Sequence, residues 1–229
     1  MRTIELHKSV TASNDRDADL LRGQMRTTGQ LLINLMSSPG SGKTSLLSRT
    51  IQDMTDVSIA VLEADIASDV DALRIEALGA RSIQAHTDGM CHMDAGMTRR
   101  SLEALAAEPG GNSQESAGRE DLIFLENVGN LICPAEFDTG AGLDVMILSV
   151  PEGDDKPLKY PLMFSRAHAL VITKTDTLSY FDFDLKACMD RVRKLNPKIR
   201  FFPVSAKTGE GMEAWENWLR DQLQTWRSH

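Results

Sequence analysis

Residues 31–44 have the sequence LLINLMSSPGSGKT, in which an apolar run leads directly into a glycine-rich turn. The apolar run predicts a buried strand at residues 31–36, and the periodicity of residues 43–54 predicts a helix. Glycines at such a turn let successive backbone N–H groups converge on phosphate oxygens at the positive end of the helix. The stretch therefore predicts a Walker A phosphate-binding loop, with Ser37 where the motif has its first glycine.

The side chains of this loop have separate roles in binding a nucleoside triphosphate. Lys43 can reach the β- and γ-phosphates, and the Thr44 hydroxyl can ligate Mg²⁺. The predicted nucleotide-binding residues of the loop are Gly40, Ser41, Gly42, Lys43, Thr44 and Ser45.

Strand and helix patterns alternate along the rest of the chain. The strand-like segments are almost continuously apolar, which indicates strands covered on both faces, as in a parallel sheet. We expect an α/β fold with a doubly wound, mostly parallel sheet and helices on both faces. Residues 1–30 form a polar N-terminal extension with one helix around residues 15–26, and residues 31–229 form a single domain in this prediction. The other expected strands are residues 57–65, 82–85, 122–128, 145–150, 169–173 and 200–204, and the other expected helices are residues 68–78, 93–105, 184–195 and 211–226.

Two short motifs at the ends of late strands indicate which base is bound. Residues 173–176 are TKTD, and residues 205–207 are SAK. An aspartate carboxylate can accept hydrogen bonds from the N1–H and exocyclic amine of guanine, a pair of donors that adenine lacks. The motifs therefore predict a guanine site, with Thr173 where such motifs usually have Asn. Its residues are Lys174, Asp176, Ser205, Ala206 and Lys207.

Two acidic residues end strands that should neighbour the phosphate loop. Asp65 closes one strand and Glu126 closes another, with Gly129 shortly after it. Carboxylates at these positions can hold Mg²⁺ and orient the attacking water, and a glycine N–H can contact the γ-phosphate. We predict Lys43, Asp65, Glu126 and Gly129 as the catalytic group, and Thr44, Asp65 and Glu126 as the magnesium ligands.

Cys91, His92 and Cys133 are candidates for a second metal site. Thiolate and imidazole suit Zn²⁺ or Ni²⁺, but three ligands are too few for a closed site in one chain. Their spacing alone does not favour a metal site over buried free cysteines. We expect Cys91 and His92 to open the helix at residues 93–105, whose dipole would lower the pKa of the Cys91 thiol. Cys188 lies on an apolar helical stripe and is expected in the core.

Charge and composition argue against several classes of function. The chain has 25 Lys and Arg against 33 Asp and Glu, a formal net charge of −8. With so little positive charge we expect neither nucleic acid nor a membrane as a partner. Three cysteines and the lack of a secretory signal pattern favour a reduced, cytoplasmic protein.

Six segments carry a resemblance to a known family: NLMSSPGSGKT, EADIASDVDALR, CHMDA, LIFLENVGNLICP, EGDDKPLKYP and SAKTGEGMEAW. They resemble the HypB family, GTPases that assist nickel insertion during maturation of nickel–iron hydrogenases. The resemblance implies a SIMIBI-class P-loop GTPase that converts GTP to GDP with Mg²⁺ and couples metal binding to its nucleotide state. It also implies that Cys91, His92 and Cys133 bind Ni²⁺ or Zn²⁺. The implied partners are a second copy of the chain, other hydrogenase maturation proteins and the hydrogenase large-subunit precursor.

Three alternative functions remain at this point. A urease-accessory relative of the same class would also handle nickel, but ENVGNLICP at residues 126–134 favours HypB. A nucleotide-dependent adaptor would switch partners without a metal. A P-loop kinase would need a phosphoacceptor pocket and would have no use for a guanine site. The chain departs from many HypB proteins in having no cysteine-rich or histidine-rich segment before residue 31, in Thr173 and in Ala64.

Overall fold

The computed structural model describes residues 6–64, 69–85, 87, 89–108 and 120–228, with the side chains of residues 6–11 and 69–72 left out. Asp65 lies outside the described residues. Within them, seven strands form one sheet in the order β3-β2-β4-β1-β5-β6-β7, and every strand pair is parallel. The strands are β1 (Leu31–Ser37), β2 (Ile59–Glu63), β3 (Arg81–Gln84), β4 (Leu122–Glu126), β5 (Leu143–Ser149), β6 (Ala169–Thr173) and β7 (Arg200–Pro203).

The doubly wound, mostly parallel α/β fold is therefore confirmed. The central strand β1 pairs with β4 on one side and with β5 on the other, so the chain reverses direction across the sheet beside β1. In sheets of this kind, ligands bind at the carboxyl ends of the strands where the order reverses. This edge of β1 leads directly into the glycine-rich turn.

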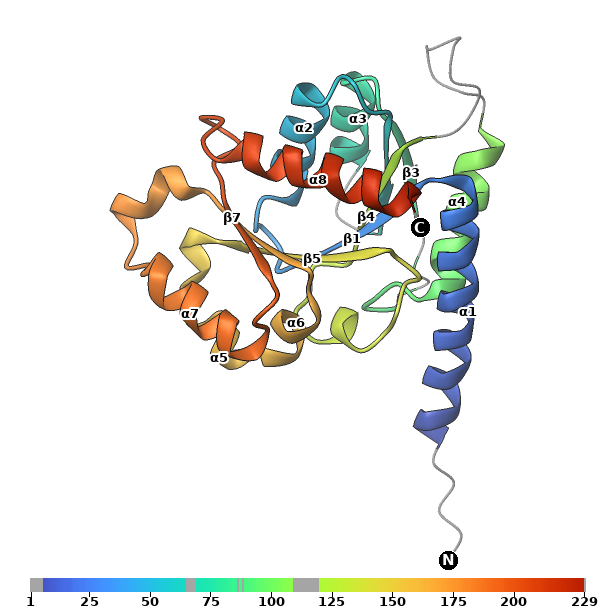
Figure 1. Cartoon of the computed structure of the whole chain (residues 1–229), viewed down its shortest axis with the longest axis horizontal. Helices are drawn as coiled ribbons and strands as arrows, with labels where there is room; N and C mark the ends of the chain where they lie inside the picture. Colours follow the sequence, from blue (N-terminus) through green and yellow to red (C-terminus); the bar gives the residue numbers. More distant parts are fainter. Residues whose placement is uncertain (1–5, 65–68, 86, 88, 109–119, 229) are drawn as a thin grey trace, which may run out of the picture.

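Helices cover both faces of the sheet (Figure 1). Helices α2, α3 and α8 lie on one side of the sheet, and α5, α6 and α7 lie on the other, while α1 runs beside α4. The α-helices are α1 (Leu6–Thr28), α2 (Lys43–Asp53), α3 (Asp69–Ala77), α4 (Ala95–Ala107), α5 (Lys156–Lys159), α6 (Pro161–Arg166), α7 (Leu185–Leu195) and α8 (Met212–Arg227). Short 3-10 turns are η1 (Cys133–Ala135), η2 (Val150–Glu152) and η3 (Thr175–Tyr180).

Two helices differ from their predicted bounds by more than one residue at an end. Helix α4 begins at Ala95 rather than at residue 93, because the Asp94 side chain accepts a hydrogen bond from the N–H of Met97 and so caps the helix. Helix α1 extends beyond residues 15–26 at both ends. Its Leu21 and Met25 are buried in the same apolar cluster as β1 and α8, so this polar segment nevertheless packs on the core.

The interior has two apolar clusters. The larger joins α1, α2 and α8 to the sheet, and the smaller packs α6 and α7 against β5 and β6. Cys188 is fully buried in the smaller cluster, and burial raises the pKa of its thiol to about 12. Its predicted place in the core is confirmed. No helix in the described part of the chain is long and apolar enough to span a bilayer.

Candidate functional site

The glycine-rich turn joins β1 to α2 as the sequence predicts. Strand β1 ends at Ser37 and α2 begins at Lys43, so the turn occupies residues 38–42. Gly42 precedes the helix with a φ of 94°, a left-handed conformation that strains any residue with a Cβ atom. The amino end of α2 therefore opens at the carboxyl edge of the central strand, where the N–H groups of a helix's first turn can bind an anion.

Lys43 is held inside the turn. Its side chain is buried, its Nζ donates to Ser37 Oγ at 3.1 Å, and it lies 3.8 Å from Glu126 Oε1 at the end of β4. Ser41 is also buried, and its Oγ has no hydrogen-bond partner among the described residues. A buried cation and an unpaired buried hydroxyl in the same turn are the groups that a phosphate would engage.

The TKTD segment is tied to this turn by two hydrogen bonds. Thr173 Oγ1 donates to the Ser41 carbonyl at 2.6 Å, and Lys174 Nζ donates to the Gly40 carbonyl at 2.8 Å. Lys174 also has a φ of 60°, the one left-handed residue other than glycine in the described chain. Such strain persists where surrounding contacts hold it, and it is common at functional sites. Thr173 therefore provides the bond to the turn although it replaces the usual Asn.

Asp176 is oriented by the second motif. Ser205 Oγ donates to Asp176 Oδ1 at 2.8 Å, although the two residues lie on different loops. The backbone around Ser205 is held in turn, because its N–H donates to Glu210 and its carbonyl accepts from Gly209. Among the described residues, the side-chain hydrogen bond to Asp176 involves Oδ1 and not the other carboxylate oxygen, Oδ2. The arrangement thus places a fixed acceptor at the end of β6.

A pocket of about 590 Å³ runs from the amino end of α2 to these two motifs. A volume in this range suits a small-molecule ligand. The predicted residues Gly42, Thr44, Ser45, Lys174, Asp176, Ala206 and Lys207 line it. Sequence reasoning missed five further lining residues that no motif contains: Ser48, Arg49, Gln52, Arg74 and Thr177. The first two follow from the α-helical period once Thr44 and Ser45 face the pocket.

Other predicted residues lie outside this pocket lining. Three of them belong to the glycine-rich turn and its junction with α2, namely Gly40, Ser41 and Lys43. The fourth is Ser205, which donates a hydrogen bond to Asp176. Glu126 is buried beside Lys43, and Gly129 follows it in the loop after β4. The predicted role of Asp65 falls outside the described residues.

The structure brings the three candidate metal ligands into one neighbourhood. Cys91 Sγ lies 3.8 Å from His92 Nδ1, and a side-chain hydrogen bond with Cys133 raises the pKa of the Cys91 thiol. The expected lowering of this pKa by a helix end is wrong, because α4 begins beyond Cys91 and the neighbouring thiol dominates. Within the described ranges, no three His, Cys, Asp or Glu side chains are already arranged to hold a metal ion. The donor types still fit a thiophilic ion such as nickel or zinc.

His92 is the most constrained of the three. It is 4% exposed, and its ring stacks on Phe137 with centroids 3.8 Å apart. Burial lowers the pKa of His92 below its usual value, partly opposed by Asp94 and Glu136. The imidazole is therefore neutral at physiological pH, which is the form that binds metals.

Two asparagines after β4 connect these ligands to the nucleotide side. Asn130 Nδ2 donates to the Cys91 carbonyl at 3.0 Å, and Asn130 Oδ1 accepts from the N–H of Cys133 at 3.1 Å. Asn127 Oδ1 accepts from the N–H of Met93 at 3.2 Å. The short segment from Glu126 to Asn130 therefore contacts Lys43 at one end and the backbone of both cysteine segments at the other.

Comparison with known proteins agrees with this geometry. The family model described as the CobW/HypB/UreG nucleotide-binding domain matches residues 31–203. The hydrogenase maturation factor HypB of Rhizobium leguminosarum bv. viciae is 46% identical over 219 residues, which cover 95% of this chain and 70% of that protein.

Two solved structures have the same fold over nearly the whole chain. The hydrogenase maturation factor HypB of Archaeoglobus fulgidus is 34% identical with a TM-score of 0.83, covering 93% of this chain and 99% of that one. HypB of Helicobacter pylori, solved in complex with nickel, is 34% identical with a TM-score of 0.85, covering 93% and 96%. With its glycine-rich turn, its two base-site motifs and its cysteine segments in the same fold, the chain belongs to the HypB family of hydrogenase maturation factors.

Proposed function

We propose that this protein is a magnesium-dependent GTPase that binds nickel and assists its insertion into a hydrogenase, with metal binding coupled to the nucleotide state. The observation that carries the proposal is the segment from Glu126 to Asn130. It lies against the phosphate-loop lysine and also holds the backbone of Cys91 and Cys133. A change at the γ-phosphate would therefore reach the metal ligands through one short piece of chain.

The nucleotide side supplies charge stabilisation and base selection. Lys43 and the N–H groups of the turn face developing negative charge on the β- and γ-phosphates. Asp176, held by Ser205, accepts hydrogen bonds from guanine. Mg²⁺, held by Thr44, Asp65 and Glu126, would neutralise phosphate charge when bound. Glu126 and the N–H of Gly129 are then placed to orient water and sense the γ-phosphate.

The coupling follows from what Asn127 and Asn130 hold. When the γ-phosphate is present, the backbone near Gly129 is drawn toward it, as in other switch segments. Asn130 moves with this backbone and changes the separation of Cys91 from Cys133. Loss of the phosphate releases the segment. Metal affinity then depends on the bound nucleotide, and linkage requires the metal to change nucleotide affinity by the same factor.

Nickel is the proposed cargo, because the relative from Helicobacter pylori is described in complex with nickel. Zinc suits the same two thiolates and imidazole and is the competing ion in any test. Cysteines that must stay reduced to bind a metal suit the cytoplasm.

We further propose that a second copy of the chain completes the metal shell. Cys91 is exposed, and the neighbouring apolar residues Met90 and Ile132 are 45% and 60% exposed. Apolar side chains beside incomplete ligands are typical of a surface that pairs across a two-fold axis. Other maturation proteins and the hydrogenase large-subunit precursor would receive or supply the metal.

The deciding experiment is a nickel titration of the purified protein, once with GDP and once with a non-hydrolysable GTP analogue. The variants are Cys91→Ala and Cys133→Ala, with Cys188→Ala as the matched control that removes a buried thiol away from the site. We expect the first two to lose high-affinity nickel and the control to retain it. If only Cys188→Ala loses nickel, the ligands are misassigned. If nickel affinity is the same in both nucleotide states, the coupling is refuted.

A further inference from the structure

Helix α1 contacts both segments that carry the candidate metal ligands. It runs beside α4 (Figure 1), and its side chains form hydrogen bonds with the loop between η1 and β5. One ligand segment, with Cys91 and His92, leads into α4. The other begins at Cys133 and continues to that loop. Helix α1 therefore contacts the continuation of each segment, at Ala95 of α4 and at Asp138 of the loop.

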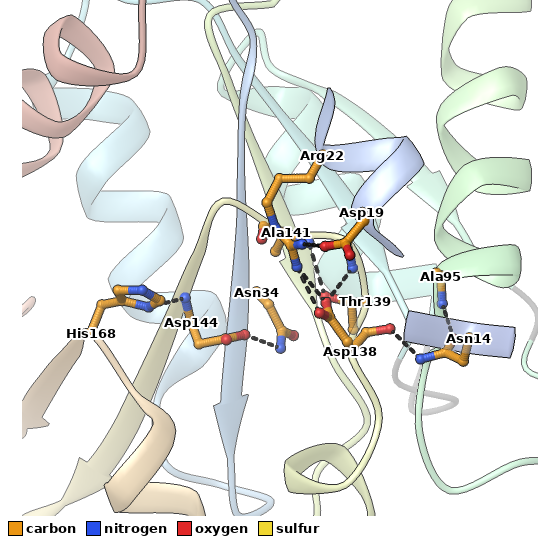
Figure 2. A network of polar contacts seen from close by, with 11 residues as sticks. Asn14, Asp19, Arg22, Asn34, Ala95, Asp138, Thr139, Ala141, Asp144 and His168 are labelled. Atoms are coloured by element: carbon orange, nitrogen blue, oxygen red, sulfur yellow. Dashed lines mark hydrogen bonds and ion pairs between the residues drawn. The ribbon is translucent and has the colours of Figure 1, made fainter. Parts of the chain in front are cut away.

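Asn14 bridges the two segments by itself. Figure 2 shows its amide between the start of α4 and the loop before β5. Asn14 Oδ1 accepts from the N–H of Ala95 at 3.0 Å, and its Nδ2 donates to the carbonyl of Asp138 at 2.9 Å. Ala95 is the first residue of α4, whose N–H would otherwise lack a helical partner. Both hydrogen-bonding ends of one short side chain are thus used.

Arg22, two turns further along α1, forms hydrogen bonds with the same loop. Its guanidinium donates to both carboxylate oxygens of Asp138, at 2.8 and 2.7 Å, and to the Ala141 carbonyl at 3.0 Å. Asp138 Oδ1 also accepts from the N–H of Gly140 at 2.8 Å. Figure 2 shows these bonds converging on one carboxylate. Both bonds to the Asp138 carboxylate come from one nitrogen, Nη2, and these charge-assisted hydrogen bonds tie the loop to the helix.

The anchored positions are close to the ligands along the chain. Ala95 follows His92 by three residues, and Asp138 follows Phe137, on which the His92 ring stacks. The Ala135 carbonyl within η1 accepts a further bond from Arg166 at 2.6 Å. Movement of α1 would therefore remove its contacts to both sides of the cysteine pair at the same time, while the bonds from Asn130 and Arg166 would remain.

We propose that Asn14 is a positioning residue for the metal site, and that α1 acts as a clamp that holds the Cys91–His92 and Cys133 segments at the separation the metal requires. The inference rests on the proposed metal role of those three residues. The clamp contributes by ordering the ligand segments before the metal arrives, which reduces the entropy lost on binding. A neutral hydrogen bond is worth a factor of about 2 to 12 in an equilibrium constant, so losing both bonds of Asn14 should weaken metal binding by about fourfold to about 140-fold.

The test is a nickel chloride titration of the full chain with GDP bound, for the wild type, Asn14→Ala, Asn14→Asp and the control Thr27→Ala. Thr27 is exposed on the same helix and bonds only within it, to the Gly23 carbonyl. Asn14→Asp keeps an acceptor for the N–H of Ala95 at the positive end of α4 but cannot donate to Asp138. It should therefore bind nickel more weakly than the wild type, and urea unfolding of all four proteins measures how much stability each substitution costs. GDP affinity should be unchanged in all four proteins.

A second titration in the Cys133→Ala background separates positioning from general destabilisation. With one ligand removed there is little geometry left to preserve, so Asn14→Ala should then change nickel affinity by less than about twofold, the lower limit for one hydrogen bond. The proposal is overturned if Asn14→Ala and Asn14→Asp bind nickel as tightly as Thr27→Ala does. It is also overturned if the loss is the same size with and without Cys133. If the wild type itself shows no Cys133-dependent nickel binding, the proposed function fails together with the clamp.

Discussion

Replacing Thr173 by Val removes one hydroxyl and keeps nearly the same shape. In the protein, that hydroxyl is buried and donates to the Ser41 carbonyl at 2.6 Å, joining the end of β6 to the phosphate loop. Loss of a buried hydrogen bond costs about 1 kcal/mol, and up to about 3 kcal/mol when the remaining partner is left unsatisfied. The variant should therefore unfold with about 1–3 kcal/mol less free energy than the wild type.

The same bond should also affect nucleotide binding, because Ser41 belongs to the turn that we propose binds the phosphates. If about 1 kcal/mol of the loss appears in binding, affinity for a fluorescent GDP falls about fivefold. The matched control is Thr173→Ser, which loses a methyl group but keeps the donor. Urea unfolding and GDP titration are measured on all three proteins.

The order of nucleotide affinities distinguishes the two explanations. If the hydroxyl matters, Ser at position 173 binds GDP better than Val does. If only packing matters, the buried methyl group makes Val at least as good as Ser. A Val variant that binds GDP like the wild type, beside a weakened Ser variant, would refute the assignment of Thr173 as the residue that ties β6 to the loop.

Three further changes test other parts of the site and the core. Asp176→Asn should lower the affinity for GTP by about tenfold to a hundredfold and favour xanthosine triphosphate, because the amide replaces a charged acceptor worth about 1.5–3 kcal/mol. Competition binding measures this, and an unchanged preference for guanine would contradict it. Lys43→Ala should lower GTP turnover by at least about a hundredfold, with the circular dichroism spectrum retained, and near-normal phosphate release would remove Lys43 from the mechanism. Glu216 is buried, and burial together with nearby Asp53 raises the pKa of its carboxyl group. The folded protein therefore holds this proton up to a higher pH than the unfolded chain does, and the free energy of unfolding falls as the pH rises from the unfolded pKa through the folded one. Glu216→Gln should therefore be more stable than the wild type at neutral pH and lose that part of the pH dependence in urea titrations; an unchanged slope would contradict it.

Local patterns in the sequence were enough to predict the elements around the nucleotide site. Strands β1 and β6, the phosphate turn and the TKTD and SAK motifs lie where their residue patterns place them. Each of these features depends on residues that are neighbours in the chain. Hydrophobic continuity predicts a strand covered on both faces, and glycines beside Lys43 predict a phosphate turn. Short helices such as α5 and α6 were not predicted, because a single turn shows no periodicity.

The beginning of α4 was predicted wrongly for a reason that is also local. The apolar pattern continues through Met93, but the Asp94 side chain is a better cap and ends the irregular segment there. Two residues of difference place Cys91 outside the helix dipole and beside Cys133. The pKa of its thiol is then raised rather than lowered. The wrong start of α4 thus led to the wrong direction for the pKa of the Cys91 thiol.

The sequence by itself predicted the fold class, which the structure confirms, and it also predicted the phosphate turn and the residues of a guanine site, because these predictions depend on period, composition and spacing within one segment. Only the tertiary structure decided which distant groups meet. Thr173 and Ser41 are 132 residues apart, and Asn14 and Asp138 are 124 residues apart. Nothing in either neighbourhood of the chain specifies its partner. The order of strands about β1 and the packing of α1 against α4 bring these groups within hydrogen-bond distance, because burial of the apolar faces sets the positions of the polar side chains attached to them.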